Sequence, residues 1–280
     1  MLLLVCLTIA LTGPLPEPGQ IEGADGILAK AQAAAKEGRM DDAVRLAGEA
    51  IAKKPADAAA YAFRGALFVS LRKPTHAASD FTKALDYDPK LVGLYHLRGQ
   101  ELFKLGRFSE SVADFDKYLE ARPSERPKHW QRGISCYYAG KFREGAAQFD
   151  AYQTVDGNDV ENAVWRFLCQ ARSEGIEKAR ASLLKVGTDK RIPLMEVYAL
   201  FAGKSQPADV LAAAKNGNPR PEELKARLFY ANLYLGLYFD VTGDRKLALK
   251  HLTAAAEQYE KYGYMGEVAR VHKDLLNKRE

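Results

Sequence analysis

The feature that most constrains this chain is a period of 34 residues in its first half. Four residue types recur three times each at that spacing: Pro55, Pro89 and Pro123; Gly65, Gly99 and Gly133; Phe81, Phe115 and Phe149; Arg64, Arg98 and Arg132. A fixed period of about 20 to 50 residues is typical of repeat arrays. Each unit of such an array buries its apolar face on its neighbours, and the stack presents an extended concave surface. We therefore expect a stack of similar units rather than one large core.

The composition fits a globular protein and argues against nucleic-acid binding. Hydrophobic residues make up 47% of the chain, enough for a core, and charged residues make up 28%. The net charge of +5 arises from 41 basic and 36 acidic side chains, with no run of like charge. A nucleic-acid-binding protein usually gathers its Lys and Arg residues on one face. We therefore do not expect nucleic acid as a partner.

The chain begins with an apolar segment. Residues 1–13 contain no charged side chain, and a proline-rich linker follows over residues 14–23. The apolar run is too short to span a bilayer, which needs about 20 residues, but it fits the core of a secretory signal. The alternative is a frayed apolar terminus. We expect residues 1–13 to be a signal segment and the protein to be exported.

Cys6 lies inside this apolar run, where a lipoprotein signal would carry its acylated cysteine. Val5 precedes it at a position where such signals have Gly, Ala or Ser. Lipid anchoring through acylation of the Cys6 thiol is therefore possible but disfavoured.

From Ala24 onward, each 34-residue block splits into two segments with helical spacing. In the second block these segments are Ala58–Leu71 and His76–Tyr87. Pro89 ends the second segment, because the residue before a proline is pushed out of the helical region. Four such blocks fill residues 24–157. Beyond them, we expect degenerate helical pairs over residues 158–220, then a final repeat-like pair with a capping helix over residues 221–280.

The order of residues within a block resembles the tetratricopeptide repeat. The second block shows it most clearly, with Tyr61-x-x-Arg64-Gly65-x-x-Phe68 in its first segment and Ala77, Phe81, Ala84 and Pro89 in its second. The glycine lets the first helix approach its neighbour, and the phenylalanine fills the groove between the helices. The resemblance implies an all-α fold, a right-handed α-solenoid of helix pairs with an irregular helical middle and a C-terminal capping helix.

The layout of the whole chain resembles the bacterial new lipoprotein I (NlpI) family. Several tetratricopeptide units and an irregular helical middle are followed by Tyr234-Leu235-Gly236-Leu237-Tyr238 before a final pair. The resemblance implies an exported, non-enzymatic adaptor in the bacterial periplasm that presents cell-wall hydrolases to a protease. Its partner would be a protein or peptide, with an envelope protease or a peptidoglycan hydrolase as the implied class.

Two other functions are kept as alternatives. The first is a structural assembly subunit of an envelope complex, which dimerises or polymerises through its helical faces. The second is an enzyme whose site is built within residues 158–220. Homodimerisation fits the adaptor as well as the assembly subunit.

Charged residues at constant offsets predict ion pairs inside the repeats. An acid follows Arg64 and Arg98 by 16 residues, at Asp80 and Asp114. We expect Arg64–Asp80 and Arg98–Asp114 pairs that join the two helices of a repeat, with two solvated charges as the alternative. In the fourth block Gln148 replaces the acid, so Arg132 must find another partner.

The resemblance also implies which side chains line the concave face, through fixed offsets on the first helix of each repeat. The face begins with small residues at Ala62, Ala66 and Val69. The predicted groove then continues through seven larger residues: His96, Gln100, Phe103, Trp130, Ile134, Tyr137 and Tyr138. Trp and Tyr are common binding anchors because they bury a large area at low entropic cost. The alternative is that some of these rings pack against the next repeat.

No residue pattern predicts catalysis. The five histidines are scattered, and none pairs at metal-ligand spacing. No HExxH motif, phosphate-binding glycine loop or serine elbow occurs, and an enzyme needs a convergent set of such groups. We expect no catalytic residue, metal, cofactor or small-molecule substrate. Cys136 and Cys169 fit buried packing residues better than a disulfide.

Overall fold

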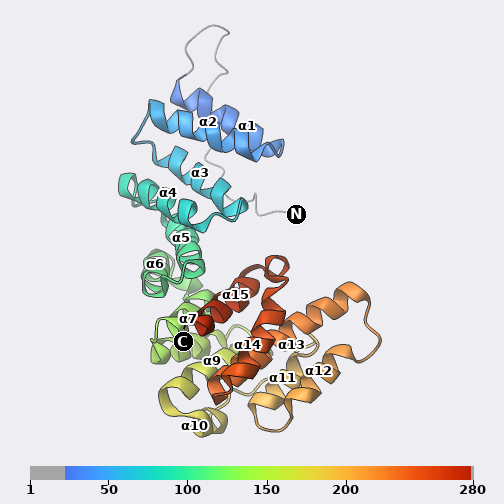
Figure 1. The fold of residues 1–280 in the computed structure, drawn as a ribbon. Coiled ribbons are helices and arrows are strands. Elements are labelled where there is room, and N and C mark those ends of the chain that lie inside the picture. Colours follow the sequence, from blue (N-terminus) through green and yellow to red (C-terminus); the bar gives the residue numbers. More distant parts are fainter. Residues whose placement is uncertain (1–22, 279–280) are drawn as a thin grey trace. The chain divides into compact units, whose positions relative to one another are not determined.

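The computed structural model describes residues 23–278. The predicted signal segment, Cys6 and nearly all of the predicted linker lie outside the described residues. Within the described range every regular element is a helix, and successive helices form pairs (Figure 1). The predicted all-α class is confirmed. The described residues divide into two compact units, which meet in sequence at Leu105 and Gly106.

The N-terminal unit contains two complete helix pairs and the first helix of a third. Its helices are α1 (Ala24–Lys36), α2 (Met40–Lys53), α3 (Ala58–Ser70), α4 (Pro74–Tyr87) and α5 (Val92–Lys104). The carboxylate of Asp57 caps α3 by accepting hydrogen bonds from the backbone N–H groups of Ala59 and Ala60. Helix α4 begins at Pro74, two residues before the predicted start, because proline is favoured in the first turn of a helix.

The C-terminal unit holds the rest of the repeats and the irregular middle. Its first half is α6 (Phe108–Ala121), η1 (Pro123–Lys128), α7 (Trp130–Tyr138), α8 (Phe142–Tyr152), α9 (Val160–Glu174) and α10 (Ile176–Ala181). Its second half is α11 (Leu194–Phe201), α12 (Pro207–Lys215), α13 (Pro221–Thr242), α14 (Arg245–Ala256), η2 (Tyr259–Tyr262) and α15 (Gly263–Asn277). The predicted final pair and terminal helix are therefore present.

Two segments differ from the predicted pattern. Pro123 and Pro127 fall in the 3-10 segment η1, so α7 begins only at Trp130 and is shorter than α3 and α5. Within the predicted degenerate pairs, helix α10 is short and ends at Ala181. Residues 182–193 instead form an irregular segment without a helix.

Three of the helix pairs close through a glycine that faces a large side chain. A Cβ atom placed on Gly65 would lie 2.7 Å from the Phe81 ring, and one on Gly133 would lie 2.6 Å from the Phe149 ring. In the last pair, a Cβ on Gly236 would lie 2.5 Å from Leu252. Real Cβ atoms do not approach so closely, so these positions accept only glycine without a shift of the partner.

Arginines at the repeat period bridge neighbouring helices. Arg64 donates to both carboxylate oxygens of Asp80, at 2.7 and 2.8 Å, which confirms the predicted pair. Arg132 turns back to Asp116 at 2.7 Å and also reaches Glu144 at 3.4 Å, so it has the other partners that its sequence context required. Arg98 and Asp114 belong to different units, and their pairing stays a prediction.

The backward contact recurs in three repeats at a separation of 16 residues. Arg98 donates to Thr82, Arg132 to Asp116 and Arg166 to Asp150. Arg166 therefore continues the arginine series by one more period. It also donates forward, to the carbonyl of Ser182 at 2.6 Å. In these three repeats, the arginine of the first helix thus bonds to the second helix of the preceding repeat.

The glycine contact predicts the effect of a single methyl group. Gly65→Ala should lower the free energy of unfolding by about 1–3 kcal/mol, because the methyl overlaps the Phe81 ring in a packed core. Gly93→Ala, where no atom lies within 4 Å of the new methyl, should instead raise it by about 0.5–1 kcal/mol through helix propensity. Urea unfolding followed by circular dichroism measures both. Similar shifts in both variants would show that the contact does not control helix packing.

Candidate protein-binding site

Three of the predicted groove residues do not face an open groove. Phe103, Ile134 and Tyr137 retain 0%, 1% and 5% of their exposed area. Their side chains are therefore part of the protein interior, and the prediction that they line an accessible surface is wrong. These three side chains are instead buried inside the helix array, as the alternative interpretation predicted.

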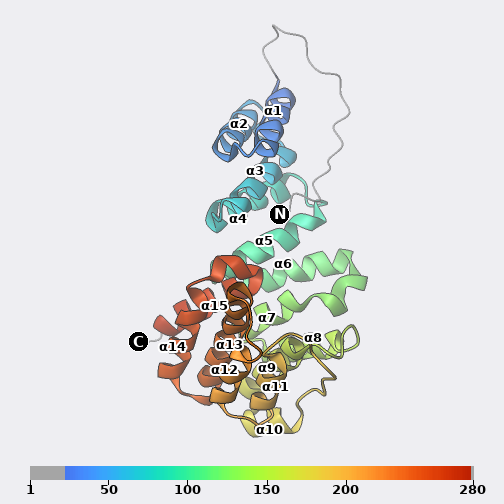
Figure 2. The same ribbon diagram turned by 90° about the vertical axis from the view of Figure 1, so that its right-hand side faces the viewer.

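The aromatic face of α7, which we define as Trp130 and Tyr138, is covered by the chain's own terminal helix. The Trp130 ring meets the ring of Tyr264 edge-on, with centroids 5.2 Å apart. The Tyr138 hydroxyl lies 2.8 Å from Nδ1 of His272. Both partners belong to α15, which runs beside α7 in two views of the C-terminal unit (Figures 1 and 2). The prediction of an open aromatic groove therefore fails at α7.

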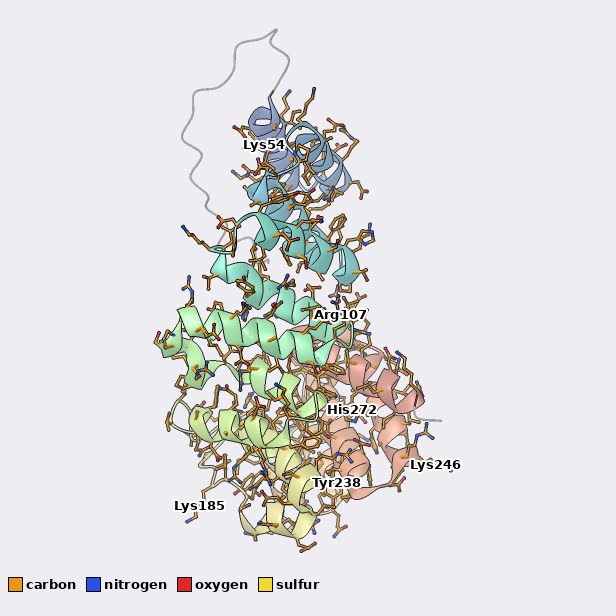
Figure 3. All side chains as sticks on the ribbon, turned by 90° about the vertical axis from the view of Figure 1, so that its left-hand side faces the viewer. Lys54, Arg107, Lys185, Tyr238, Lys246 and His272 are labelled. Atoms are coloured by element: carbon orange, nitrogen blue, oxygen red, sulfur yellow. The ribbon has the colours of Figure 1, made fainter. Side chains whose placement is uncertain are left out.

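A chain of hydrogen bonds anchors this contact. Nε2 of His272 lies 3.0 Å from a carboxylate oxygen of Asp240 on α13, and Arg172 on α9 donates to the same carboxylate. Nε of Arg172 also donates to the Tyr137 hydroxyl at 3.3 Å, so the chain returns to α7. Figure 3 labels His272, which points from α15 into the C-terminal unit and is 4% exposed. Four helices are thereby joined through side chains that lie far apart in sequence.

The charges of this network suit a structural role. Burial raises the pKa of Tyr138 well above its ordinary value and that of Tyr137 to about 12. Burial also acts to raise the pKa of Asp240, but hydrogen bonds and charges from His272 and Arg172 outweigh it and lower that pKa to about 2. The two hydroxyls therefore stay protonated while Asp240 stays ionised. Asp240 is thus a charged acceptor that two side chains from other helices share, which suits a network that holds helices together.

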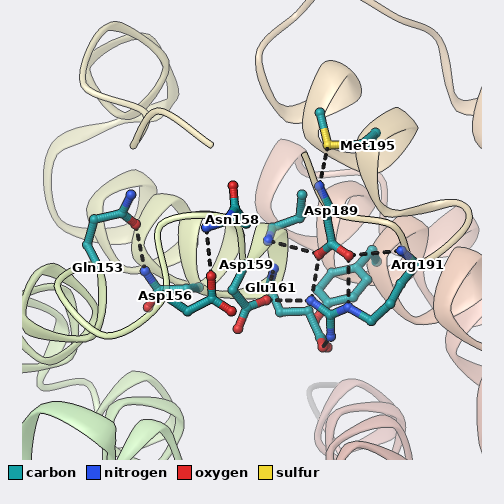
Figure 4. Close-up of polar contacts among 11 residues, drawn as sticks. Gln153, Asp156, Asn158, Asp159, Glu161, Asp189, Arg191 and Met195 are labelled. Carbon is teal, nitrogen blue, oxygen red and sulfur yellow. Dashed lines mark hydrogen bonds and ion pairs between the residues drawn. The ribbon is translucent and has the colours of Figure 1, made fainter. Parts of the chain in front are cut away.

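A second polar cluster holds the irregular middle. Arg191 is surrounded by three carboxylates, with Asp159 at 2.6 Å, Glu161 at 2.5 Å and Asp189 at 2.6 Å (Figure 4). The Tyr234 hydroxyl donates to Glu161 at 2.5 Å, which ties α13 to the start of α9. These carboxylates are engaged by Arg191 and Tyr234. No group of His, Cys, Asp and Glu residues in the described range could hold a metal ion.

A cavity of about 360 Å³ lies beside this cluster. Its lining includes Ile192 and Met195, whose side chains are 46% and 37% exposed. The alternative of an enzyme site within residues 158–220 has its best location here. The cavity brings together apolar side chains and an arginine already engaged by carboxylates, but no nucleophile with a neighbouring base.

The N-terminal unit presents the remaining part of the predicted groove. Ala62 is buried, whereas Ala66 and Val69 on α3 and His96 and Gln100 on α5 are partly exposed. Nε2 of His96 lies 2.9 Å from the side-chain nitrogen of Gln100, one helical turn further on. Burial lowers the pKa of His96, so its ring is neutral near pH 7 and has both a donor and an acceptor nitrogen.

Two further sequence expectations concern cysteines and membranes. Cys136 and Cys169 are free, buried thiols, as predicted. Burial raises the pKa of Cys136 to about 11 and that of Cys169 further still, so neither is a reactive thiolate. None of the described helices combines the length and the apolar character needed to cross a bilayer.

Comparison with known proteins shows which repeat and which solved structures this fold is similar to. Residues 92–125, which span α5 and α6, match the family model of the tetratricopeptide repeat. A search of curated proteins found no match. Among solved structures, a tetratricopeptide repeat protein from Parabacteroides merdae is 16% identical, with 91% of this chain and 99% of that chain covered and a TM-score of 0.56.

Two further structures are similar. YrrB, described as a tetratricopeptide protein with an unusual peptide-binding site, is 19% identical, with 69% and 92% of the two chains covered and a TM-score of 0.53. The C-terminal part of a repeat-containing protein from Cytophaga hutchinsonii is 18% identical, with 82% and 94% covered and a TM-score of 0.50. At such identities the likeness concerns the fold alone. The fold is an α-solenoid of helix pairs, and residues 92–125 within it match the tetratricopeptide repeat.

The buried network predicts a pH-dependent loss of stability. Asp240→Asn should lower the free energy of unfolding at pH 7 by about 2–3 kcal/mol, because it removes the charge that Arg172 and His272 share. Asp150→Asn, which loses a similar pair at a carboxylate that is 48% exposed, should cost less than about 1 kcal/mol.

The sign of the pH effect follows from the lowered pKa of Asp240. Between pH 3.8 and about 2 the unfolded state binds more protons than the folded state, so this contribution is complete above pH 4 and is lost as pH falls. Urea titrations from pH 7 to pH 3 should therefore show the difference between wild type and Asp240→Asn shrinking below pH 4. If the difference in stability between the two proteins stayed constant down to pH 3, Asp240 would not be the group with the lowered pKa.

Proposed function

We propose that the protein is a non-enzymatic scaffold that binds a segment of another protein on the exposed face of α3 and α5. Tetratricopeptide folds bind protein or peptide partners, and the concave side of the helix array is the surface that stacking leaves available. The aromatic face of α7 is already covered by α15, whereas Ala66, Val69, His96 and Gln100 are partly exposed.

The observation that carries the proposal is the chemistry of this face. Ala66 and Val69 are small, so the backbone of a bound segment can approach α3 closely. His96 and Gln100 place hydrogen-bonding groups one turn apart on α5, where they can pair with that backbone. The description of YrrB as having a peptide-binding site supports the same mode of action for this fold.

The finer proposal concerns location and partner. The apolar segment over residues 1–13 supports export, and the resemblance to the NlpI family supports an adaptor that presents cell-wall hydrolases to an envelope protease. Such a partner would be a protein, with no nucleic acid or small molecule involved.

Export is tested with a reporter that is active only outside the cytoplasm. Residues 1–23 fused to alkaline phosphatase should give an active, processed enzyme. A fusion with Leu3→Lys and Leu7→Lys, which break the apolar run, should stay inactive. Equal activity of both fusions, or none from the wild-type segment, would contradict export.

Partner binding is tested with His96→Ala/Gln100→Ala in the full chain. Proteins captured from an extract of the native organism by wild type and by the control Lys83→Ala, an exposed position on α4, should be lost by the double variant. Calorimetry with the identified partner should then show an affinity at least about tenfold lower. Equal binding by all three proteins would place the site elsewhere.

A further inference from the structure

Helices α7 and α15 present matching contact residues at the same spacing. On α7, Trp130 and Tyr138 are eight residues apart; on α15, their partners Tyr264 and His272 are also eight residues apart. Residues at this spacing lie on one side of a helix, separated by about 12 Å along its axis. The two helices therefore run in the same direction and touch at both ends of this stretch.

The two ends of this contact differ chemically. At the Trp130 end it is an edge-on ring contact, with the two planes at 86°. At the Tyr138 end it is a hydrogen bond to His272, and the rings of these two residues are 5.6 Å apart. An aromatic group and a hydrogen-bonding group at fixed spacing are the features by which a surface recognises a helix laid against it.

Helix α15 has a second and larger packing face. It packs on α14, and Arg245 at the start of α14 donates to its Leu276 carbonyl at 2.7 Å. Val268, Ala269 and Val271 of α15 are buried. On α15, Tyr264 and His272 make the ring and hydrogen-bond contacts with α7. Helix α15 can therefore give up α7 and still cap α14.

We propose that the aromatic face of α7 is a docking surface for an amphipathic helix, and that α15 occupies it within the chain. The external occupant is a helix of another protein that carries an aromatic residue and, eight residues later, a side chain able to accept the Tyr138 hydroxyl hydrogen. Binding requires that α15 withdraw from α7, so the contact is autoinhibitory. This inference does not rest on the face of α3 and α5, and its test leaves that face unchanged.

The test uses a synthetic peptide with the sequence of residues 259–278 as the external helix. The full-length protein is compared with two variants that weaken the internal contact and leave α7 intact, Tyr264→Ala and Tyr264→Ala/His272→Ala. Fluorescence anisotropy of the labelled peptide should show binding about threefold tighter for the single variant and at least tenfold tighter for the double variant, since internal competition is reduced.

Three controls give the result its meaning. Lys273→Ala, whose ion pair is with Asp274 on α15 itself, should bind the peptide within twofold of wild type. Adding Trp130→Ala to the double variant should remove the gain. A peptide with alanine at the positions of Tyr264 and His272 should not bind to any of the proteins.

The Tyr264→Ala variant should stay folded even if the double variant does not, because it keeps the His272–Asp240 hydrogen bond. Thermal melts on the same preparations identify the folded proteins. Folded variants that bind the peptide no better than wild type would overturn the proposal. So would a gain that survives Trp130→Ala, since the peptide would then be bound elsewhere. Failure of either kind leaves binding at α3 and α5 to be judged by its own variants.

Discussion

The close approach of paired helices at a glycine is the contact on which the rest of the structure depends. At Gly65, Gly133 and Gly236 there is no room for a Cβ atom, because the side chain that comes 16 residues later fills the space. This contact sets how the two helices of a repeat cross, and so where every other side chain of the pair points. It occurs in both units and in the last pair, where the repeat motif is otherwise faint.

The arginine series depends on that crossing. Once the glycine contact sets the register, a residue on the first helix lies near positions 16 residues away in both directions, and the guanidinium of Arg166 uses both. Arg64 binds forward to Asp80, whereas Arg132 binds back to Asp116. The same residue type thus has different partners, depending on which neighbouring helix supplies a carboxylate. A planar fork of donors suits this position better than a lysine, which offers a single point of charge.

The parts of the fold that follow the repeat period could be predicted from the sequence, because each contact joins residues at a constant offset. The Arg64–Asp80 pair and the helix pairs are of this kind. The contact of Tyr138 with His272 joins residues 134 positions apart in unrelated parts of the pattern, so no periodicity predicts it. The shortened α7 did leave a signal, since Pro123 and Pro127 stand where an extended first helix would begin. The sequence contains no such signal for the cluster around Arg191, because its carboxylates belong to loops and helix ends that follow no repeat.

The covered face of α7 changes how the function of the protein is understood. Positions that an isolated repeat would offer to a partner are used in this chain to close the C-terminal unit, through Trp130 and Tyr138. Amide hydrogen exchange of the full chain tests this account most directly, by comparing wild type with Tyr138→Phe, which loses only the hydroxyl. If Tyr138 holds α15, exchange in residues 263–277 should accelerate by about tenfold, as expected for a lost hydrogen bond, while α1 to α4 remain unchanged. Equal exchange of α15 in the two proteins would show that its other contacts hold the helix and that the Tyr138 hydroxyl does not.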